Sequence, residues 1–442
     1  MPPPLVDKLM SLGFHEPSAR SRAALITEVD DAFVRQVGHK PAWRLWVPGR
    51  VEFFGKHTDY AGGRSLIAAV PRGFAVAANR RGDDVVRVID ARRGVEAAIH
   101  QADTSTIHHG WSTYVATVVR RLAANFPGAR LGADVVVASD LPSAAGLSSS
   151  SAFIVGVVGA LMQCGALTNR EEWREMGTIQ DFAGYLGAVE AGASYGRLAG
   201  TTGVGTHGGS EDHTAIVACC PGMISEYRYV PVRHLGDVSM PAAWTCVIAT
   251  SGVHADKIGS ARDRFNRAAA AVRALVDLWR QITHEQPASL AAALMSAPDA
   301  SACLSAAIPR VSVPDFSAGE LARRLTHFLR EDPRVPDAAR AFAGSDAAAL
   351  DALSRDSQDD AKALLGNQVA ETIALVAAAR SAGALAASSF GAGFGGSVWA
   401  LVPAEDVDRF GPAWLERYRA QHSHIAGVEW FAAPPSPPLL AI

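Results

Sequence analysis

The chain has 442 residues, enough for two or three domains. Apolar residues make up 49% of it and charged residues 19%, a composition typical of a globular protein with a large core. Its 41 basic and 44 acidic residues give a net charge of −3, so no general positive field favours nucleic acid as a partner.

The N-terminus and the cysteines predict a cytoplasmic protein. The opening MPPPLVDKLM has no apolar run of signal-peptide length, and Asp7 comes early. The longest uncharged stretch, Leu141 to Asn169, has an apolar part only about half the roughly 20 residues of a membrane span, so we expect a buried helix and no membrane partner. The five cysteines show no CxxC spacing, which favours reduced thiols.

The first half of the chain predicts strands followed by helices. Residues 1–25 read as a helical lead-in, because Leu5, Leu9 and Phe14 recur at helical spacing. The expected strands are WRLWV (43–47), SLIAAV (65–70), FAVAA (74–78), VVRVIDA (85–91) and ADVVVAS (133–139), and the expected helices are 112–126, the segment after LPSAAGLSSSS, and 171–195. This order favours an α+β fold over a doubly wound one.

The second half predicts a separate domain rich in helices. Residues 227–244, with proline, glycine and no clear period, are expected to cross between domains. After them we expect a strand TCVIATSG, a helix from about Asp256 to Trp279, alanine-rich helices over 288–384, and strands SVWALV and GVEWFAA. The tail PPSPPLLAI should be extended, because proline cannot donate to a sheet ladder. The predicted units are a lead-in (1–25), a first domain (26–228), a second domain (229–433) and a proline-rich tail (434–442).

One stretch concentrates charge between two strand-like runs. GRVEFFGKHTDYAGG, residues 49–63, places Arg50, Glu52, Lys56, His57 and Asp59 within ten positions. An ion-paired hairpin tip is one interpretation, since charge runs are usually solvated. A binding site is the other.

A second stretch, LPSAAGLSSSSAFIVGVVGA, is typical of a phosphate loop. A strand enters a turn of small residues that opens directly into an apolar helix, so a ligand can approach the backbone and the free N–H groups at the helix start can bind an anion. An ordinary N-cap needs one serine. Four in a row, Ser148 to Ser151, favour phosphate binding.

Other familiar site patterns fail. GRVEFFGKH misses a Walker A loop twice, because five residues separate its glycines and His57 stands where Ser or Thr belongs. GAGFGG (391–396) has GxGxxG spacing, but a strand follows it where a dinucleotide-binding unit needs a helix. The histidine pairs 108/109 and 422/424 lack ligands at metal-site spacing, so surface histidines are the simpler interpretation.

Three motifs together resemble the GHMP kinase family, and most closely its galactokinases. Their first motif, close to GRVNLIGEHTDYNGG, matches residues 49–63; the Pro-x-x-x-Gly-Leu-Ser-Ser-Ser loop matches Pro142 to Ser150; and the GGGFGG turn before a strand matches GAGFGG, with Gly393, Gly395 and Gly396. The motifs follow the family order and span almost the whole chain.

The resemblance implies a two-domain α+β fold with the active site in the cleft between the domains. The N-terminal domain would be ribosomal-protein-like and the C-terminal domain ferredoxin-like. It also implies an ATP-dependent sugar kinase that uses Mg²⁺, with the anomeric hydroxyl of galactose or a related sugar as acceptor. We expect a monomer or a dimer.

The resemblance also assigns residues to the nucleotide and to the metal. The serine loop would hold the triphosphate of ATP, and Ser150, three positions after the leucine of Gly-Leu, would touch magnesium. A second magnesium ligand would come from an earlier helix, where Glu190 is the best match, although the stretch between Glu190 and Asp212 is longer here than in galactokinases. The implied ATP-binding residues are Gly146, Leu147, Ser148, Ser149, Ser150 and Ser151.

In galactokinases the catalytic aspartate belongs to a CGIMDQ motif. The best counterpart here is GTHGGSEDHTAI, so the resemblance makes Asp212 the catalytic aspartate. The resemblance places Arg50 beside it. The chemistry agrees, because a carboxylate in reach of a weakly nucleophilic hydroxyl can accept its proton and a cation can offset phosphoryl charge. Asp59 would accept hydrogen bonds from two ring hydroxyls, His57 would orient it or the sugar, and Gly209 would adjoin them. The simpler alternative for Asp212 is a loop acid that caps the next helix.

This chain departs from the galactokinase motifs at several positions. Lys56 replaces a glutamate that contacts the sugar near its C6 hydroxyl, and Glu52 replaces an asparagine. Lys56 and Glu52 could simply form an ion pair with each other. Alternatively, because an ammonium group can only donate hydrogen bonds, the substrate could be a uronic acid, or a pentose that lacks the C6 group. Ala144 replaces a loop glycine, and His213 stands in place of a glutamine.

Two other functions remain possible from the sequence. A non-catalytic sugar and ATP sensor would tolerate the changes at Lys56 and Glu52, but it has less need of a base such as Asp212. A kinase of a non-sugar alcohol such as mevalonate is disfavoured by the HTDY segment, which resembles the sugar-binding motif.

Overall fold

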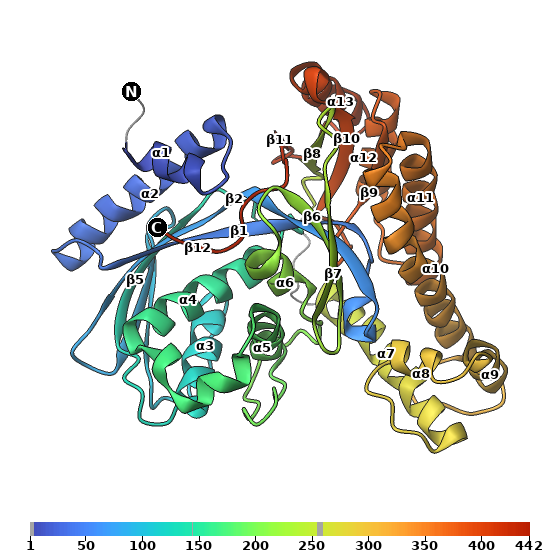
Figure 1. The fold of residues 1–442 in the computed structure, drawn as a ribbon, viewed down its shortest axis with the longest axis horizontal. Coiled ribbons are helices and arrows are strands. Elements are labelled where there is room, and N and C mark those ends of the chain that lie inside the picture. Colours follow the sequence, from blue (N-terminus) through green and yellow to red (C-terminus); the bar gives the residue numbers. More distant parts are fainter. Residues whose placement is uncertain (1–3, 144, 254–259) are drawn as a thin grey trace.

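The computed structural model describes residues 4–143, 145–253 and 260–442, and it contains two β-sheets with helices on their faces (Figure 1). Ala144, the first three residues of the lead-in and the expected helix start at Asp256 lie outside the described residues. No helix in the described part of the chain combines the length and the apolar character needed to cross a membrane.

The lead-in is helical, as predicted, but it extends beyond residue 25. It forms α1 (Pro4–Ser11) and α2 (Glu16–Val37). Helix α2 continues because Val29 and Phe33 keep the helical spacing and pack against one face of the first sheet. It ends at Gly38, whose φ of 90° is the left-handed conformation common at helix C-termini.

The first sheet has eight strands. Six follow the order β12-β1-β2-β5-β3-β4, while β6 pairs with β2 and β7 pairs with β6. Their bounds are β1 Trp43–Phe54, β2 Arg64–Arg80, β3 Val85–Asp90, β4 Val95–His100, β5 Ala133–Ser139, β6 Met223–Arg228, β7 Arg233–Ser239 and β12 Leu440–Ala441. Four helices cover the face opposite α2 (Figure 1): α3 Ser112–Asn125, α4 Ser149–Gly165, α5 Ile179–Ala191 and α6 Glu211–Ala218.

The second sheet has four antiparallel strands in the order β11-β8-β10-β9. They are β8 Trp244–Thr250, β9 Ala386–Ser389, β10 Ser397–Pro403 and β11 Trp430–Ala432. The helices of this half are α7 Ser260–Thr283, α8 Leu290–Met295, α9 Ala300–Ala307, α10 Ala318–Ala343, α11 Ala347–Asp360, α12 Ala370–Ser381 and α13 Val407–Gln421. Short helical turns are η1 Asp59–Ala61, η2 Leu167–Asn169, η3 Glu171–Met176, η4 Ala361–Leu365 and η5 Ala404–Asp406.

Several sequence-based boundaries are wrong in detail. Strand β1 continues through the first motif to Phe54, so Arg50 and Glu52 lie on a strand and not in a loop. Strand β4 was not expected, because its exposed and buried residues alternate too weakly in hydropathy. The helix expected over residues 171–195 is divided, since Thr178 forms a capping box that starts α5 anew.

The expected crossing over residues 227–244 is also wrong. Residues 223–239 form the β6–β7 hairpin, which extends the first sheet beyond β2. The predicted domain boundary between residues 228 and 229 therefore falls inside a hairpin, and the second sheet begins with β8. The tail returns to the first sheet, where Leu440 pairs with Trp46 of β1.

Candidate active site

Residues from the first and third motifs and from the segment around Asp212 line a common cavity between the two sheets. Its described lining comes from β1, the loop after β1, α4, α5, the start of α6, α7 and the glycine-rich turn. Of the residues selected from sequence, it includes Arg50, His57, Asp59, Ser151, Glu190, Gly209 and Asp212. Lys56 is not among the lining residues.

Arg50 and Asp212 form an ion pair at the centre of this cavity. Arg50 donates from Nε to Asp212 Oδ1 over 2.8 Å, and its Nη2 lies 2.7 Å from the same oxygen. Its Nη1 donates to the carbonyl of Gly146 in the serine loop. Burial alone would lower the pKa of Arg50, but the charges of Asp212 and nearby glutamates raise it above its ordinary value. Arg50 thus connects the serine loop to the carboxylate.

Ser151 connects that carboxylate to a second one. Its Oγ donates to Glu190 Oε2 over 2.8 Å and lies 3.4 Å from Asp212 Oδ2. His213 Nε2 lies 3.1 Å from the same oxygen of Glu190. The structure therefore places Ser151 beside Glu190, whereas Ser150, the serine expected to share a metal with it, lines a neighbouring cavity.

The part of the first motif around His57 and Asp59 is held in a strained turn. His57 has a φ of 59°. Its Nε2 donates to the Ala392 carbonyl over 3.1 Å, and its Nδ1 lies 2.7 Å from Tyr60 Oη. Asp59 Oδ2 accepts the backbone N–H of Glu211 over 3.3 Å. A Cβ at Gly209 would lie 2.4 Å from the same oxygen, so only glycine permits this approach.

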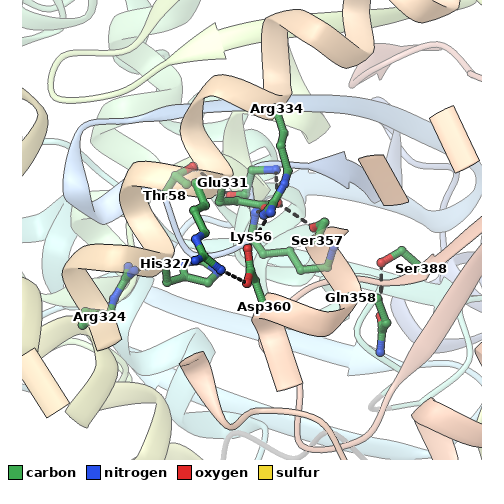
Figure 2. Close-up of polar contacts among 12 residues, drawn as sticks. Lys56, Thr58, Arg324, His327, Glu331, Arg334, Ser357, Gln358, Asp360 and Ser388 are labelled. Atoms are coloured by element: carbon green, nitrogen blue, oxygen red, sulfur yellow. Dashed lines mark hydrogen bonds and ion pairs between the residues drawn. The ribbon is translucent and has the colours of Figure 1, made fainter. Parts of the chain in front are cut away.

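Lys56 points away from this cavity. Its side chain is buried, and Nζ donates to Ser357 Oγ over 2.7 Å, while Ser357 donates to Glu331 over 2.9 Å. Figure 2 shows Lys56 gathered with these residues and Arg334 between α10 and α11. The suggested pairing of Lys56 with Glu52 is not observed, and substrate contact by Lys56 is not supported by its position. Lys56 lies two residues beyond the end of β1, where its side chain reaches α11.

Helix α10 fixes the turn that carries His57 and Asp59, a role the sequence did not reveal. Glu331 Oε1 accepts the backbone N–H of Gly55 over 3.1 Å and that of Lys56 over 3.3 Å. Arg324 donates to the carbonyl of His57 over 2.5 Å. Asp332 accepts the N–H of Arg64 over 2.7 Å. A helix of 26 residues within an alanine-rich region gave no local signal of these contacts, which join positions about 270 apart.

The serine loop has the geometry expected from its sequence. Strand β5 leads into it, and α4 begins at Ser149 after Ser148 adopts a φ of 59°. The Oγ atoms of Ser148 and Ser149 are buried and have no hydrogen-bond partner among the described residues. Both hydroxyls are therefore available to a ligand at the start of α4.

A second cavity of about 320 Å³ adjoins the serine loop. Aromatic side chains of Phe74, Trp111 and Phe153 line one part of it, and Ser149 and Ser150 line another. Sequence reasoning did not select the aromatic residues, because they come from three separate elements. The combination of flat apolar walls with serine hydroxyls suits a nucleotide.

The glycine-rich turn lies between β9 and β10 and packs against the serine loop. Ser397, directly after it, donates to the carbonyl of Ala145 over 2.6 Å. Gly393 and Gly395 have positive φ, and a Cβ at either would lie within 2.7 Å of a backbone carbonyl. Gly396 adjoins Gly146. These glycines permit close packing, whereas Gly391 and Ala392 line the cavity.

Family models match three parts of the chain. The galactokinase galactose-binding signature matches residues 31–80, the N-terminal domain of GHMP kinases matches 113–192, and their C-terminal domain matches 338–420. The first match contains Arg50, His57 and Asp59, and the second contains the serine loop and Glu190.

Individual proteins resemble the chain over most of its length. A galactokinase of Chloroflexus aggregans is 29% identical over 395 residues, covering 88% of this chain and 90% of the relative. A galactokinase of Actinobacillus pleuropneumoniae serotype 5b is 27% identical over 401 residues, covering 88% and 92%. The crystal structure of Lactococcus lactis galactokinase complexed with galactose shares the fold, with a TM-score of 0.76 and 20% identity over 94% of this chain and all of that one. The chain therefore belongs to the GHMP kinase family and is most like its galactokinases.

Proposed function

We propose that the chain is an ATP-dependent sugar kinase of the galactokinase type, which transfers the γ-phosphate of ATP to a sugar hydroxyl. The observation that carries this function is the Arg50–Asp212 pair, which stands where the serine loop meets the sugar motif. The names of the relatives and the galactokinase signature support the substrate class. The reacting hydroxyl would be the anomeric one.

Asp212 is suited to act as the base. One of its oxygens is held by Arg50, and the other lies near Ser151 on the cavity wall. A sugar hydroxyl bound against this second oxygen can pass its proton to Asp212 as its oxygen attacks the phosphorus. Arg50 keeps the carboxylate ionised and offsets charge on the transferring group.

Ser151 and Glu190 fit a magnesium ion. The two side chains offer neighbouring oxygens beside the serine loop, and Mg²⁺ prefers one or two protein carboxylates with phosphate oxygens completing its shell. Within the described residues no three His, Cys, Asp or Glu side chains form a ready metal site, which agrees with an ion held partly by ATP. When bound, magnesium would neutralise phosphate charge.

The second cavity would bind the nucleotide. Ser149 presents an unpartnered hydroxyl to its phosphates, and Trp111 and Phe153 supply flat walls for the base. The sugar would lie against Asp59, His57 and Gly209. The free thiols of all five cysteines support a location in the reducing cytoplasm.

The alternatives receive less support. A uronic acid was suggested by Lys56, but this ammonium group bonds to Ser357 outside the cavity. A sensor needs no aspartate held by an arginine beside a serine loop.

A coupled assay of ADP release with galactose, other hexoses, pentoses and uronic acids tests the function. We expect turnover with galactose or a close relative, and we expect Asp212→Asn to abolish turnover while ATP binding, measured by calorimetry, persists. Equal turnover by the Asn variant would refute the role of Asp212. Absence of sugar-dependent ADP release from the wild type would refute the kinase itself.

A further inference from the structure

Two glutamates in the wall of the sugar cavity have no place in the proposed mechanism. Glu52 lies on β1 and is 2% exposed, and Glu211 is the first residue of α6 and is 5% exposed. Both line the cavity. The galactokinase motifs quoted above have asparagine and methionine at these two positions, so this chain has placed two carboxyl groups where those motifs have none.

The carboxyl group of Glu52 is poorly satisfied by the protein. Glu52 Oε2 accepts the N–H of Gly391 over 3.3 Å, but Oε1 is buried and receives no hydrogen bond from any donor of the described chain. Glu211 lines the same cavity, close enough for the charge of Glu52 to act on it.

The surrounding charges compensate the two carboxyl groups only in part: burial opposes their ionised forms, while Lys56 and Arg50 favour that of Glu52 and Arg50 favours that of Glu211. The described lining carries five carboxylic acids, from Glu52, Asp59, Glu190, Glu211 and Asp212, against the guanidinium of Arg50. Arg50 is engaged by Asp212, and Lys56 faces the space between α10 and α11. Burial and mutual repulsion raise the pKa of Glu211 well above its ordinary value, and burial raises that of Glu52.

On the basis of the proposed function, we propose that Glu52 and Glu211 select a sugar that carries an ammonium group, an amino sugar, and reject sugars that carry a carboxylate. An ammonium group has three donors and no acceptor, so it matches acceptors that lack donors. We take galactosamine as the probe, because it carries its ammonium group on the carbon next to the anomeric one. When it binds, a proton held by Glu211 leaves to solvent, and both carboxylates then face one cation.

The test compares galactosamine, galactose and galacturonate at pH 7. We expect galacturonate to be the poorest of the three substrates for the wild type. In Glu211→Gln and in Glu52→Gln, the ratio of kcat/KM for galactosamine to kcat/KM for galactose should fall at least tenfold. A double variant, Glu52→Asn with Glu211→Met, restores the residues of the galactokinase motifs and should show the smallest ratio. Glu226→Gln is the matched control, because Glu226 is half-buried with a raised pKa but lies on β6 outside the cavity.

Calorimetry supplies a readout that folding defects do not imitate. Binding of galactosamine, measured in two buffers of different ionisation enthalpy, should release a proton from the wild type and not from the double variant, whereas galactose should release none from either. An unchanged substrate ratio in the glutamine variants, or galactosamine binding without proton release, overturns the inference. If no sugar is phosphorylated, the kinase proposal fails, and the calorimetric comparison still decides the role of the glutamate pair.

Discussion

Arg50 Nε donates to Oδ1 of Asp212 over 2.8 Å, although the two residues are 162 positions apart. Arg50 comes from the middle of β1 and Asp212 from the first turn of α6. The bond leaves the second carboxylate oxygen of Asp212 facing the cavity near Ser151. An aspartate fixed in this way needs little reorganisation when it accepts a proton.

Replacement of Arg50 tests this arrangement. Arg50→Lys keeps a positive charge but loses the planar fork that holds both Asp212 and the Gly146 carbonyl. We expect kcat to fall about 100-fold or more, in line with the loss of one preorganised donor at a site of developing charge. Stopped assays at saturating ATP and galactose give kcat, and circular dichroism verifies the fold. A kcat within threefold of wild type would argue against a role for Arg50 in phosphoryl transfer.

Lys56 should contribute to stability and not to substrate choice. Lys56→Met removes the ammonium group next to Glu331, a fully buried carboxylate whose pKa is lowered by Lys56 and Arg334 against the opposing effect of burial. We expect the free energy of unfolding, measured in urea, to fall by about 1–3 kcal/mol, because Ser357 loses a buried charged partner while Glu331 keeps its ion pair with Arg334.

The matched variant for Lys56 adds Glu331→Gln, which removes the carboxylate charge but also its ion pair with Arg334 over 3.0 Å, so it should not recover the lost stability. The ratio of kcat/KM for galacturonate and galactose should not change in Lys56→Met. A changed ratio with unchanged stability would indicate that Lys56 contacts the substrate.

The choice between Ser150 and Ser151 as magnesium ligand can be tested directly. Ser151 Oγ lies 2.8 Å from Glu190 Oε2, whereas Ser150 lines the nucleotide cavity. We expect Ser151→Ala to raise the magnesium concentration for half-maximal activity about tenfold or more, since loss of a ligand or its support typically costs 10- to 100-fold in metal affinity. Manganese binding followed by electron paramagnetic resonance provides a readout without turnover. The opposite order of effects, with Ser150→Ala the more severe, would restore the sequence-based expectation.

The stability of the folded chain should decrease in mild acid because of His327. Burial, followed by the charge of Arg324, lowers the pKa of His327 well below 6.5. The unfolded chain then binds a proton below about pH 6.5 that the folded chain does not, so the free energy of unfolding falls as pH falls. His327→Gln cannot titrate, and its urea unfolding between pH 7.5 and 5.5 should show a shallower slope, by up to about 1.4 kcal/mol per pH unit. Equal slopes would mean that His327 titrates normally.

The sequence predicted the elements whose signal is local. The strand, turn and helix around Ser148 to Ser151 could be predicted because small residues and a long apolar run are contiguous. The β6–β7 hairpin was missed because its second strand is exposed and contains glycine, so hydropathy gave no period.

The candidate site was predicted where a motif carries it and missed where partners are distant. Arg50 and Asp212 were placed together from the resemblance, and the structure pairs them. The position of Lys56 depends on Glu331 and Ser357, which lie in helices of no distinctive sequence. Neither propensity nor spacing can reveal a contact between residues 275 or more positions apart.

The return of the tail to the first sheet brings the two ends of the polypeptide together. Leu5 of α1 and Leu440 and Ile442 at the other end pack against the same apolar cluster. A short glycine-rich linker could therefore join them, and new ends could be opened at an exposed turn such as the one after β3. A circular permutant of this kind should retain the fold, whereas deletion of the last nine residues would uncover an edge of β1.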